Sequence, residues 1–185
     1  DVDTAFMELQ AGTIDILKHL TSAQVQTLND SFKVESGSMN LVQAMFLNSA
    51  YEPLSKKEVR QALCYGGDRD AINQFLFGGK SHLIGSHMIP NMAVYYEPQA
   101  EKVYSYDPAK AKELLTEAGY PDGFDLEITV PSSYSQHVDT AQIIVEELSQ
   151  IGVNATINQV EWSTWLSDVY TDGKFEATVI GFDGT

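Results

Sequence analysis

The chain has 185 residues, of which 43% are hydrophobic and 20% are charged, as in an ordinary globular domain or part of a larger protein. Its formal net charge of −15, from 26 acidic and 11 basic residues, would repel a phosphate backbone, so we expect no nucleic-acid partner. No apolar run approaches the roughly 18 residues of a membrane-spanning helix, and the single cysteine, Cys64, excludes an internal disulfide and a four-cysteine metal site.

Short helices and one strand are predicted for the first third of the chain. In order, these are a helix over residues 3–11, a brief strand or turn over 13–17, a helix over 22–29, a strand over 38–48 and a helix over 56–65. Gly12 ends the first helix, and Thr21 with Ser22 supplies an N-terminal cap for the second. Because the run over 38–48 is almost continuously apolar, we expect a strand that is covered on both faces.

A charged helix corner is predicted at residues 58–79, EVRQALCYGGDRDAINQFLFGG. Two glycine pairs, at 66–67 and 78–79, end successive helices. Asp68 caps the second helix, and Asp70 falls in its first turn, where the helix dipole favours an acid.

The two arginines of this corner, Arg60 and Arg69, are expected to bind nearby carboxylates or carbonyl oxygens. The charge cluster is therefore interpreted as a lock between two helices and not as a binding site. Cys64, in the same stretch, is expected to be a buried, small apolar residue.

The middle of the chain combines an irregular stretch with a clear helix signal. Residues 80–106 contain prolines and little periodicity, so we expect an ordered excursion that is packed by its aromatic side chains. Asp107 and Pro108 then start a helix, as an N-cap followed by proline at the first helical position. Gly119 ends this helix with a left-handed C-terminal cap.

The last third predicts an α/β unit. A strand over 125–130, a long helix that ends at Gly152, a strand over 153–160, a helix over 163–173 and a strand over 175–182 follow one another. Right-handed crossovers would make neighbouring strands parallel. No linker divides the chain, so residues 1–185 are expected to form a single domain, and the abrupt sequence at both ends favours a piece of a longer protein.

Residues that could support metal binding or catalysis are sparse. His82 and His87 lie in the irregular stretch without a helix to align them, and His19 and His137 stand alone, which indicates surface or cap positions. Neither a nucleophile elbow nor a phosphate-binding loop is present in the sequence. We therefore expect no catalytic residue and no metal ligand.

Recognition is better supported, because three segments follow the predicted strands at one edge of the sheet. Trp162 lies where a strand meets a helix, whereas Trp165, three residues on, is expected in the core. The loop with Ser133, Tyr134 and Gln136 opens a helix whose N-terminus offers backbone N–H groups. Ligands of open α/β sheets bind at this edge.

The third segment is the end of the last strand, Phe182 and Asp183. The three segments converge without a catalytic group among them, which is typical of a recognition surface.

Four blocks of sequence, in order, resemble a known family. They are PLSKKEVRQALCYGGDRDAI, YDPAKAKELLTEAGYPDGFDLEITV, VEELSQIGVNATINQVEWSTWL and GKFEATVIGF. Together they resemble the extracytoplasmic solute-binding proteins of peptide-type ABC importers, the dipeptide, oligopeptide and nickel-binding group, over nearly the whole chain.

The resemblance implies one lobe of a bilobal, type II periplasmic-binding-protein-like fold, with a mixed sheet flanked by helices. The chain resembles the second, C-terminal lobe, and the other lobe would come from segments before and after it. A ligand is enclosed when two such lobes close. A single lobe is therefore expected to bind weakly.

The ligand-facing residues implied by the resemblance are carried over one at a time. Trp162 matches the tryptophan of the family's Glu-Trp element, and Ser133, Tyr134 and Gln136 match the loop that opens the long helix. Phe182 stands where the family has tryptophan after glycine. Asp183 follows at once, near the place of an aspartate that receives the amino group of peptide ligands.

Val179 occupies the neighbourhood of an arginine found in some oligopeptide binders, so no carboxylate anchor is expected from that position. The block from Tyr106 to Tyr120 matches positions that look architectural.

The leading hypothesis is a non-catalytic solute-binding protein for a peptide or similar small polar solute, which it presents to the membrane subunits of an ABC permease. The resemblance implies an extracytoplasmic location, in the periplasm or at the cell surface with a membrane anchor, and no cofactor. A metal or metal-chelate carrier that uses His82, His87 or His137 is the alternative. A hydrolytic enzyme is the third hypothesis.

Overall fold

A computed structural model describes residues 2–37 and 39–183 of the chain. The helices are α1 (Val2–Gln10), α2 (Ser22–Thr27), α3 (Glu52–Ser55), α4 (Lys57–Gly66), α5 (Arg69–Phe77), α6 (Pro108–Glu117), α7 (Ser135–Ser149) and α8 (Trp162–Thr164). Two 3₁₀ helices, η1 (Pro90–Tyr95) and η2 (Pro98–Lys102), and a π-helical segment, η3 (Trp165–Thr171), complete the helical elements. The strands are β1 (Leu41–Leu47), β2 (Asp125–Pro131), β3 (Asn154–Val160) and β4 (Ala177–Asp183).

The four strands form one mixed sheet in the order β1-β4-β2-β3. β2 pairs in parallel with β3 along its whole length and in parallel with β4 at Ile128–Ala177 and Thr129–Thr178. The predicted parallel arrangement of the three C-terminal strands and the mixed α/β fold class are confirmed.

β1 differs from its prediction. It pairs antiparallel with β4, from Leu41–Asp183 to Leu47–Ala177, and it is the edge strand of the sheet. Val42 is its one buried residue, and the others are half-buried. The expectation of a strand covered on both faces is therefore wrong, because an apolar run alone does not distinguish a central strand from an edge strand.

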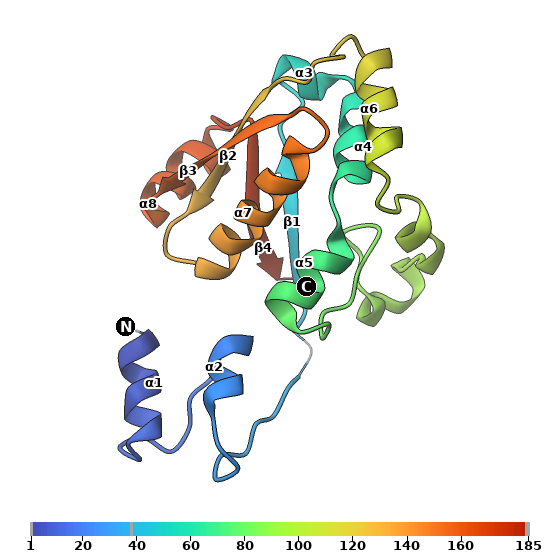
Figure 1. Ribbon diagram of the computed structural model, residues 1–185. Coiled ribbons are helices and arrows are strands. Elements are labelled where there is room, and N and C mark those ends of the chain that lie inside the picture. The colour runs from blue at the N-terminus through green and yellow to red at the C-terminus, as the bar shows by residue number, and fades with distance from the viewer. Residues whose placement is uncertain (1, 38, 184–185) are drawn as a thin grey trace.

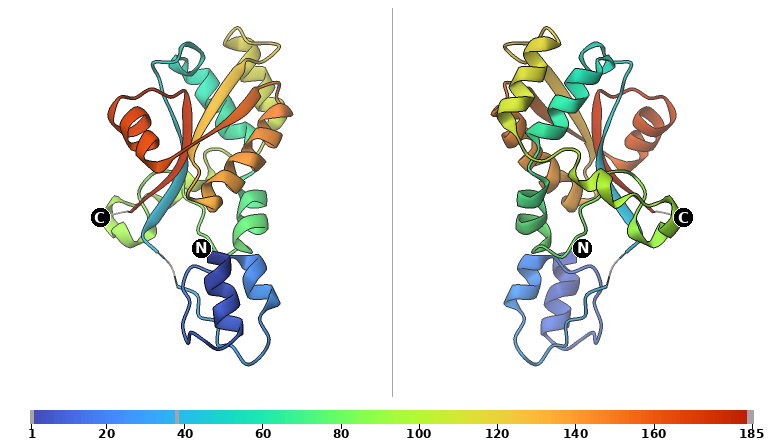
Figure 2. Two further views of the ribbon diagram at one scale, coloured as in Figure 1. Left: turned by 90° about the vertical axis from the view of Figure 1, so that its left-hand side faces the viewer. Right: turned by 90° about the vertical axis from the view of Figure 1, so that its right-hand side faces the viewer.

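Helices cover both faces of the sheet (Figure 1, Figure 2). α7, α4 and α6 lie on one face, where the main core gathers around Ile128 of β2, Leu148 of α7 and Leu115 of α6. α8 and η3 cover the other face, where Trp165 and Val169 pack on Ile180. No helix among the described residues is long and apolar enough to cross a membrane.

The helix predicted over 163–173 begins at Trp162 and continues as the π-helical segment η3. The Asp172 amide donates to the Ser167 carbonyl five residues back, at 3.0 Å. The sequence carries no signal for the wider turn, since the apolar pattern of this stretch also fits an ordinary α-helix.

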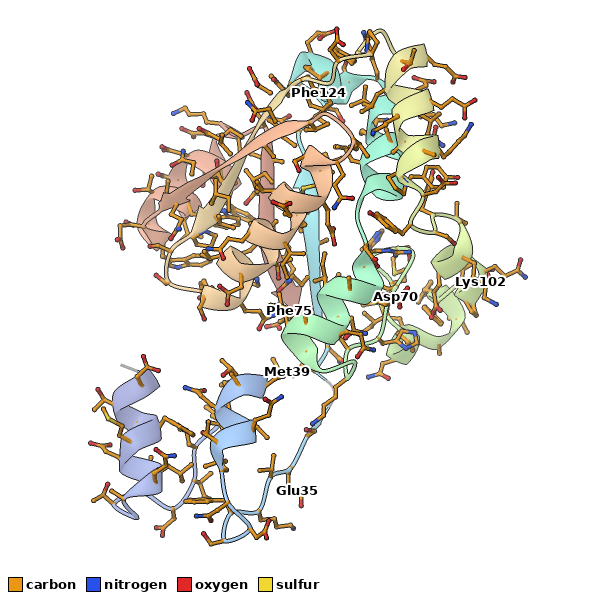
Figure 3. All side chains as sticks on the ribbon, viewed as in Figure 1. Glu35, Met39, Asp70, Phe75, Lys102 and Phe124 are labelled. Carbon is orange, nitrogen blue, oxygen red and sulfur yellow. The ribbon has the colours of Figure 1, made fainter. Side chains whose placement is uncertain are left out.

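Residues 2–37 lie apart from the sheet and its helices (Figure 1), with Glu35 at one end of the molecule and Phe124 at the other (Figure 3). Leu9 is the one buried side chain among residues 3–37. The Ser22 hydroxyl, which donates to the Leu76 carbonyl at 3.3 Å, is one of the few links to α5. This segment therefore contributes little to the core, although its predicted Thr21 cap is present, with a reciprocal bond from Gln24.

The corner between α4 and α5 has the predicted Asp68 cap, but the two arginines do not lock these helices together, because Arg60 bonds to α3 and Arg69 to the excursion over residues 80–106. The Asp68 carboxylate accepts from the Ala71 amide at 3.0 Å and so caps α5. Arg60 donates to the carbonyls of Leu54 and Ser55 at 2.8 and 2.9 Å, so it locks the turn between α3 and α4.

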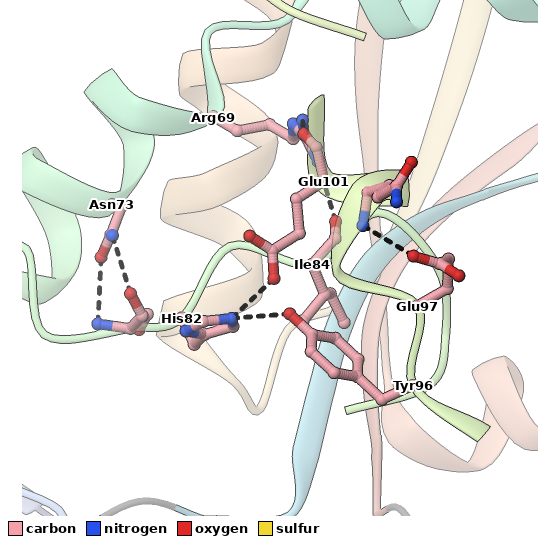
Figure 4. Close-up of polar contacts among 9 residues, drawn as sticks. Arg69, Asn73, His82, Ile84, Tyr96, Glu97 and Glu101 are labelled. Atoms are coloured by element: carbon pink, nitrogen blue, oxygen red, sulfur yellow. Dashed lines mark hydrogen bonds and ion pairs between the residues drawn. The ribbon is translucent and has the colours of Figure 1, made fainter. Parts of the chain in front are cut away.

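Arg69 anchors the excursion over residues 80–106 to α5. Its guanidinium donates to three carbonyl oxygens of the excursion, those of Ile84, Glu101 and Tyr104, at 2.8, 3.2 and 2.9 Å. Figure 4 shows this anchor beside His82. The prediction that the arginines bind carbonyls is confirmed.

A buried glutamate completes the corner and was not anticipated from the sequence. Glu147 of α7 is 7% exposed, and its carboxylate accepts from the Asp68 amide at 3.0 Å. Burial raises the pKa of Glu147 from 4.5 to about 7, and the hydrogen bond from the Asp68 amide opposes this shift.

Cys64 of α4 is exposed, so the expectation of a buried thiol is wrong. It falls on the outer side of α4, whereas Ala62 and Leu63 face the core.

Gly119 adopts a φ of 90° directly after α6 and so forms the predicted left-handed end of that helix. The Tyr120 amide then donates to the Leu115 carbonyl at 2.8 Å. A side chain at position 119 would be strained in this conformation.

We predict that Asp68→Ala lowers the free energy of unfolding by about 1 kcal/mol, because α5 loses its N-terminal cap. Asp68→Asn, which keeps a capping oxygen, is the control and should lie within about 0.5 kcal/mol of the wild type. Urea denaturation of the three proteins measures the difference. Equal loss in both variants would show that the carboxylate acts by charge and not as a cap.

We further predict that Glu147 makes stability fall as the pH rises. Because its folded-state pKa is raised, its contribution is fully present below about pH 4.5 and is lost as the pH passes through about 7. Relative to Glu147→Gln, the wild type should lose up to about 3 kcal/mol across this range. Glu146→Gln, at the exposed neighbouring position, should leave the profile unchanged. Parallel wild-type and Glu147→Gln profiles would contradict the assignment.

Candidate functional site

The carboxyl ends of β2, β3 and β4 meet at one edge of the sheet, since all three strands are parallel (Figure 1). The loop from β2 to α7, the start of α8 and the end of β4 therefore come together there. We call the predicted site residues on these three segments the candidate rim: Ser133, Tyr134, Gln136, Trp162, Phe182 and Asp183.

Aromatic rings connect the three segments. Tyr134 meets Trp162 edge to face, with ring centroids 5.4 Å apart. Trp162 stacks on Trp165 at 5.3 Å with the planes 3° apart, and Trp165 lies 6.5 Å from Phe182. We call Tyr134, Trp162 and Phe182 the aromatic wall. Tyr134 and Phe182 are 45% and 40% exposed, so the aromatic wall presents apolar rings to the solvent.

Trp165 supports this wall from behind. It is 2% exposed, which confirms the prediction that it belongs to the core. Its indole Nε1–H donates to the buried Thr178 hydroxyl of β4 at 3.0 Å. The hydrogen bond fixes the ring plane on which Trp162 stacks, so the orientation of Trp162 depends on a residue buried beneath it.

The remaining rim residues are polar and exposed. Ser133 lies in the turn between β2 and α7, and Asp183 ends β4. Gln136, in the first turn of α7, donates from Nε2 to the Gln43 side-chain oxygen of β1 at 2.7 Å. The rim therefore reaches β1, an element that the sequence did not connect with the site.

A histidine that the sequence indicated as a surface or cap residue is in fact buried beside the rim. His137 is 6% exposed, its Nδ1 lies 2.9 Å from the Gln43 Oε1, and its Nε2 accepts from the Gly181 amide at 3.2 Å. Burial lowers its pKa below the ordinary value. The expectation is wrong because the first turn of α7 points inward at this position, and Gln43 was the signal that could have revealed it, as a polar residue inside an apolar run.

The histidines of the alternative metal hypothesis are not gathered in one place. The His82 Nε2 lies 2.9 Å from a Glu101 carboxylate oxygen and 3.0 Å from the Tyr96 hydroxyl (Figure 4). His87 is exposed in the same excursion, whereas His137 uses both ring nitrogens. Within the described ranges 2–37 and 39–183, no group of three or more His, Cys, Asp or Glu residues is placed to hold a metal ion.

Two hollows of the molecule lie away from the candidate rim. One, of about 480 Å³, is bounded by Met7, Glu8 and Ile14 near α1. The other, of about 70 Å³, lies between the sheet and η3, beside Thr129 and Asp168. Neither is lined by a rim residue, so the rim is an exposed wall and not the lining of either hollow.

Comparison with known proteins gives a family match over the whole chain. The model of the family described as bacterial extracellular solute-binding proteins, family 5 Middle, matches residues 1–185. Heme-binding protein A of Haemophilus influenzae is 29% identical over 100% of this chain and 34% of its own length. The dipeptide-binding protein of Escherichia coli K12 is 28% identical over 100% of this chain and 35% of its own length.

Solved structures agree with this match. The dipeptide-binding protein of Pseudoalteromonas sp. SM9913 in complex with Met-Leu superposes with a TM-score of 0.84 at 28% identity, over 99% of this chain and 37% of that one. The binding protein AgaA of A. tumefaciens R10 in complex with agropinic acid gives 0.78 at 30% identity, over 98% and 37%. The chain thus spans about a third of the length of the relatives it matches.

We predict that Trp165→Phe lowers the free energy of unfolding by about 1–3 kcal/mol, because it leaves the Thr178 hydroxyl buried without a partner. Adding Thr178→Val to this variant should restore part of the loss, since the unpaired hydroxyl is then gone. Denaturant unfolding of the two single variants and the double variant forms the cycle. Strictly additive losses would show that the hydrogen bond does not couple the two residues.

Proposed function

Because the chain belongs to the family 5 bacterial extracellular solute-binding proteins, we propose that it binds a peptide or similar small polar solute at the candidate rim. The proposed role is that of the substrate-binding component of an ABC importer, which delivers the solute to the permease. The rim holds no nucleophile–base pair within the described residues, and the family's members are binding proteins, so the proposed role involves no catalysis.

One observation carries the proposal: partly exposed aromatic rings from three segments gather at the carboxyl edge of the sheet around one buried indole. Tyr134 contacts Trp162 at 5.4 Å, and Trp162 and Phe182 both contact the buried Trp165, at 5.3 and 6.5 Å between ring centroids. Rigid aromatic rings offer a large contact area to a ligand at a small loss of side-chain entropy. Carboxyl edges of parallel strands are also where α/β proteins bind their ligands.

The ligand classes named for the relatives fit this wall. The relatives with more than 25% identity include proteins named for dipeptides and glutathione, and a structure that holds Met-Leu. Such ligands carry an amino group, a carboxylate and apolar side chains. In the proposed site, Asp183 would attract the amino group and the rings would contact the side chains.

We propose that residues 1–185 act as the second, C-terminal lobe of a two-lobed protein, and that the ligand is enclosed when another lobe closes over the rim. The exposed rings support this, since exposed apolar surface marks an interaction site, and its burial against a second surface would stabilise the closed form. The exposed apolar side chains of residues 3–37, among them Ile16 at 86%, support an additional contact between this segment and the rest of such a protein.

The proposed place of action is outside the cytoplasm, as the family's description as extracellular suggests. Delivery to an ABC permease follows from the same family assignment, and the permease subunits are the proposed membrane partners.

A metal-chelate carrier is not favoured by any specific contact. A solved complex of NikZ from Campylobacter jejuni with Ni(L-His) resembles this chain at 22% identity, which supports a shared fold alone. His82, His87 and His137 come from two separate regions, the excursion and the start of α7, and His137 has no free ring nitrogen.

We predict that Tyr134→Ala and Trp162→Ala in the full-length protein each weaken binding of a Met-Leu dipeptide by at least about tenfold, because each removes part of the aromatic wall. Tyr106→Ala is the matched control: it removes a tyrosine that is 41% exposed and bonds to Gln150, at the far end of α7. Calorimetry measures the three affinities.

Equal weakening by Tyr106→Ala would indicate a general effect on the fold. Unchanged affinity in both rim variants would place the ligand elsewhere. If neither Met-Leu nor glutathione bound to the wild type, these two ligand classes would be excluded.

A further inference from the structure

His137 joins the three elements that carry the polar side of the candidate rim. It lies in the first turn of α7, its Nδ1 is 2.9 Å from the Gln43 Oε1 of β1, and its Nε2 accepts from the Gly181 amide of β4 at 3.2 Å. β4 pairs with β2 only at Ala177 and Thr178, so the Gly181 amide lies beyond that ladder, and the imidazole takes the place of a strand partner. A Cβ at position 181 would lie 3.0 Å from Leu41 Cδ1 and 3.3 Å from His137 Cε1, so glycine leaves room for both side chains.

Two backbone groups fix the direction of every hydrogen bond in this network. The Gly181 amide can only donate, so Nε2 of His137 must accept and the ring proton of the neutral form is on Nδ1. At the other end, the Thr140 hydroxyl donates to the Gln136 carbonyl at 2.8 Å and therefore accepts from Gln43 Nε2 at 2.7 Å. Gln43 Oε1 is thus turned toward His137, where it accepts from Nδ1–H and from Gln136 Nε2.

A second proton on His137 is incompatible with this arrangement. Nε2–H and the Gly181 amide would then face each other as two donors, 3.2 Å apart. Breaking that contact releases the end of β4, next to Phe182 and Asp183.

Within the described residues, His137 has no charged hydrogen-bond partner that would stabilise an imidazolium. The hydrogen-bond partners of His137 in the described chain, Gln43 and Gly181, are uncharged. From the N-cap of α7, the titratable neighbour is Tyr134, whose ring lies 5.6 Å away, and the nearest carboxylate of α7 itself, Asp139, is exposed. From β4 it is Asp183, which stands two residues from Gly181 and so on the same face of the strand. β1 contributes no titratable residue, since Leu41–Leu47 is LVQAMFL. Burial lowers the pKa of His137, in keeping with these contacts.

We propose that His137 is a positioning residue of the rim: in its neutral form it holds α7, β1 and β4 in register, and protonation separates them and weakens ligand binding. The effect of His137 protonation on ligand affinity rests on the proposed function. The hydrogen-bond network that connects His137 with Gly181 and Gln136 does not. The rim would therefore hold its ligand at neutral pH and release it in acid.

An NMR titration of the chain tests the arrangement without a ligand. Between about pH 7 and pH 4.5, the Gly181 amide and the Gln136 side-chain amide should shift together with the His137 ring nitrogens, at one common midpoint below the ordinary histidine value of about 6.5. The ¹⁵N shifts at neutral pH should identify the Nδ1–H form. A Gly181 amide that does not follow the His137 titration, or an Nε2–H form, would overturn the inference.

Two variants then connect His137 with binding of Met-Leu to the full-length protein. His137→Gln keeps an acceptor for the Gly181 amide but does not titrate, so the change of its affinity with pH, relative to its own value at neutral pH, serves as the reference. On acidification the wild type should lose at least about tenfold more affinity than His137→Gln, which corrects for every other titrating group. His137→Phe has no acceptor for the Gly181 amide, so it should bind Met-Leu weakly at every pH measured.

Parallel pH profiles of the wild type and His137→Gln would contradict the proposed coupling. Failure of the wild type to bind Met-Leu at neutral pH, with the NMR result as expected, would instead count against the proposed ligand class.

Discussion

The parallel pairing of β2 with both β3 and β4 is the constraint on which the candidate site depends. Strands that run in one direction bring the loops after them to the same edge of a sheet. Here those loops carry Tyr134, Trp162 and Phe182, which are far apart in the sequence but lie within one chain of ring contacts. If β4 ran antiparallel to β2, Phe182 would lie at the opposite edge and the aromatic wall would not form.

The incomplete pairing between β2 and β4 is equally important for the candidate rim, because it affects the end of β4. The two strands separate after Thr129 and Thr178, and this leaves the end of β4 to be held by other groups. β1 holds one side of β4 through an antiparallel ladder, and His137 of α7 accepts from the Gly181 amide on the other. The end of β4 therefore depends on side chains as well as on backbone pairing, and a change of charge on one imidazole can affect it.

Phe182 of the aromatic wall and Gly181 of the polar network lie on opposite faces of β4. Phe182 and Thr178 face η3, where Trp165 packs, while Gly181 and Asp183 face α7. The wall is fixed by burial of Trp165, and the network is fixed by backbone groups whose donor or acceptor role cannot change. Two different physical means thus position the residues on the two faces of one strand end, and both act on the candidate rim.

The sequence by itself determined the ends of helices, which depend on local chemistry: the Asp68 cap, the start of α6 at Pro108 and the left-handed Gly119. Its hydrophobic pattern also predicted the core position of Trp165 and the alternation of strands and helices that makes the C-terminal strands parallel. Only the tertiary structure decided that β1 is an antiparallel edge strand, that His137 is buried, that Cys64 is exposed and that η3 is a π-helix. Each of these depends on which elements pack together, and an apolar run or a lone histidine carries no information about its neighbours in space. The rim residues could be named from the sequence because they follow strands, but the buried groups that hold them, Gln43 among them, come from elements distant in the chain and became visible only once the fold had brought them together.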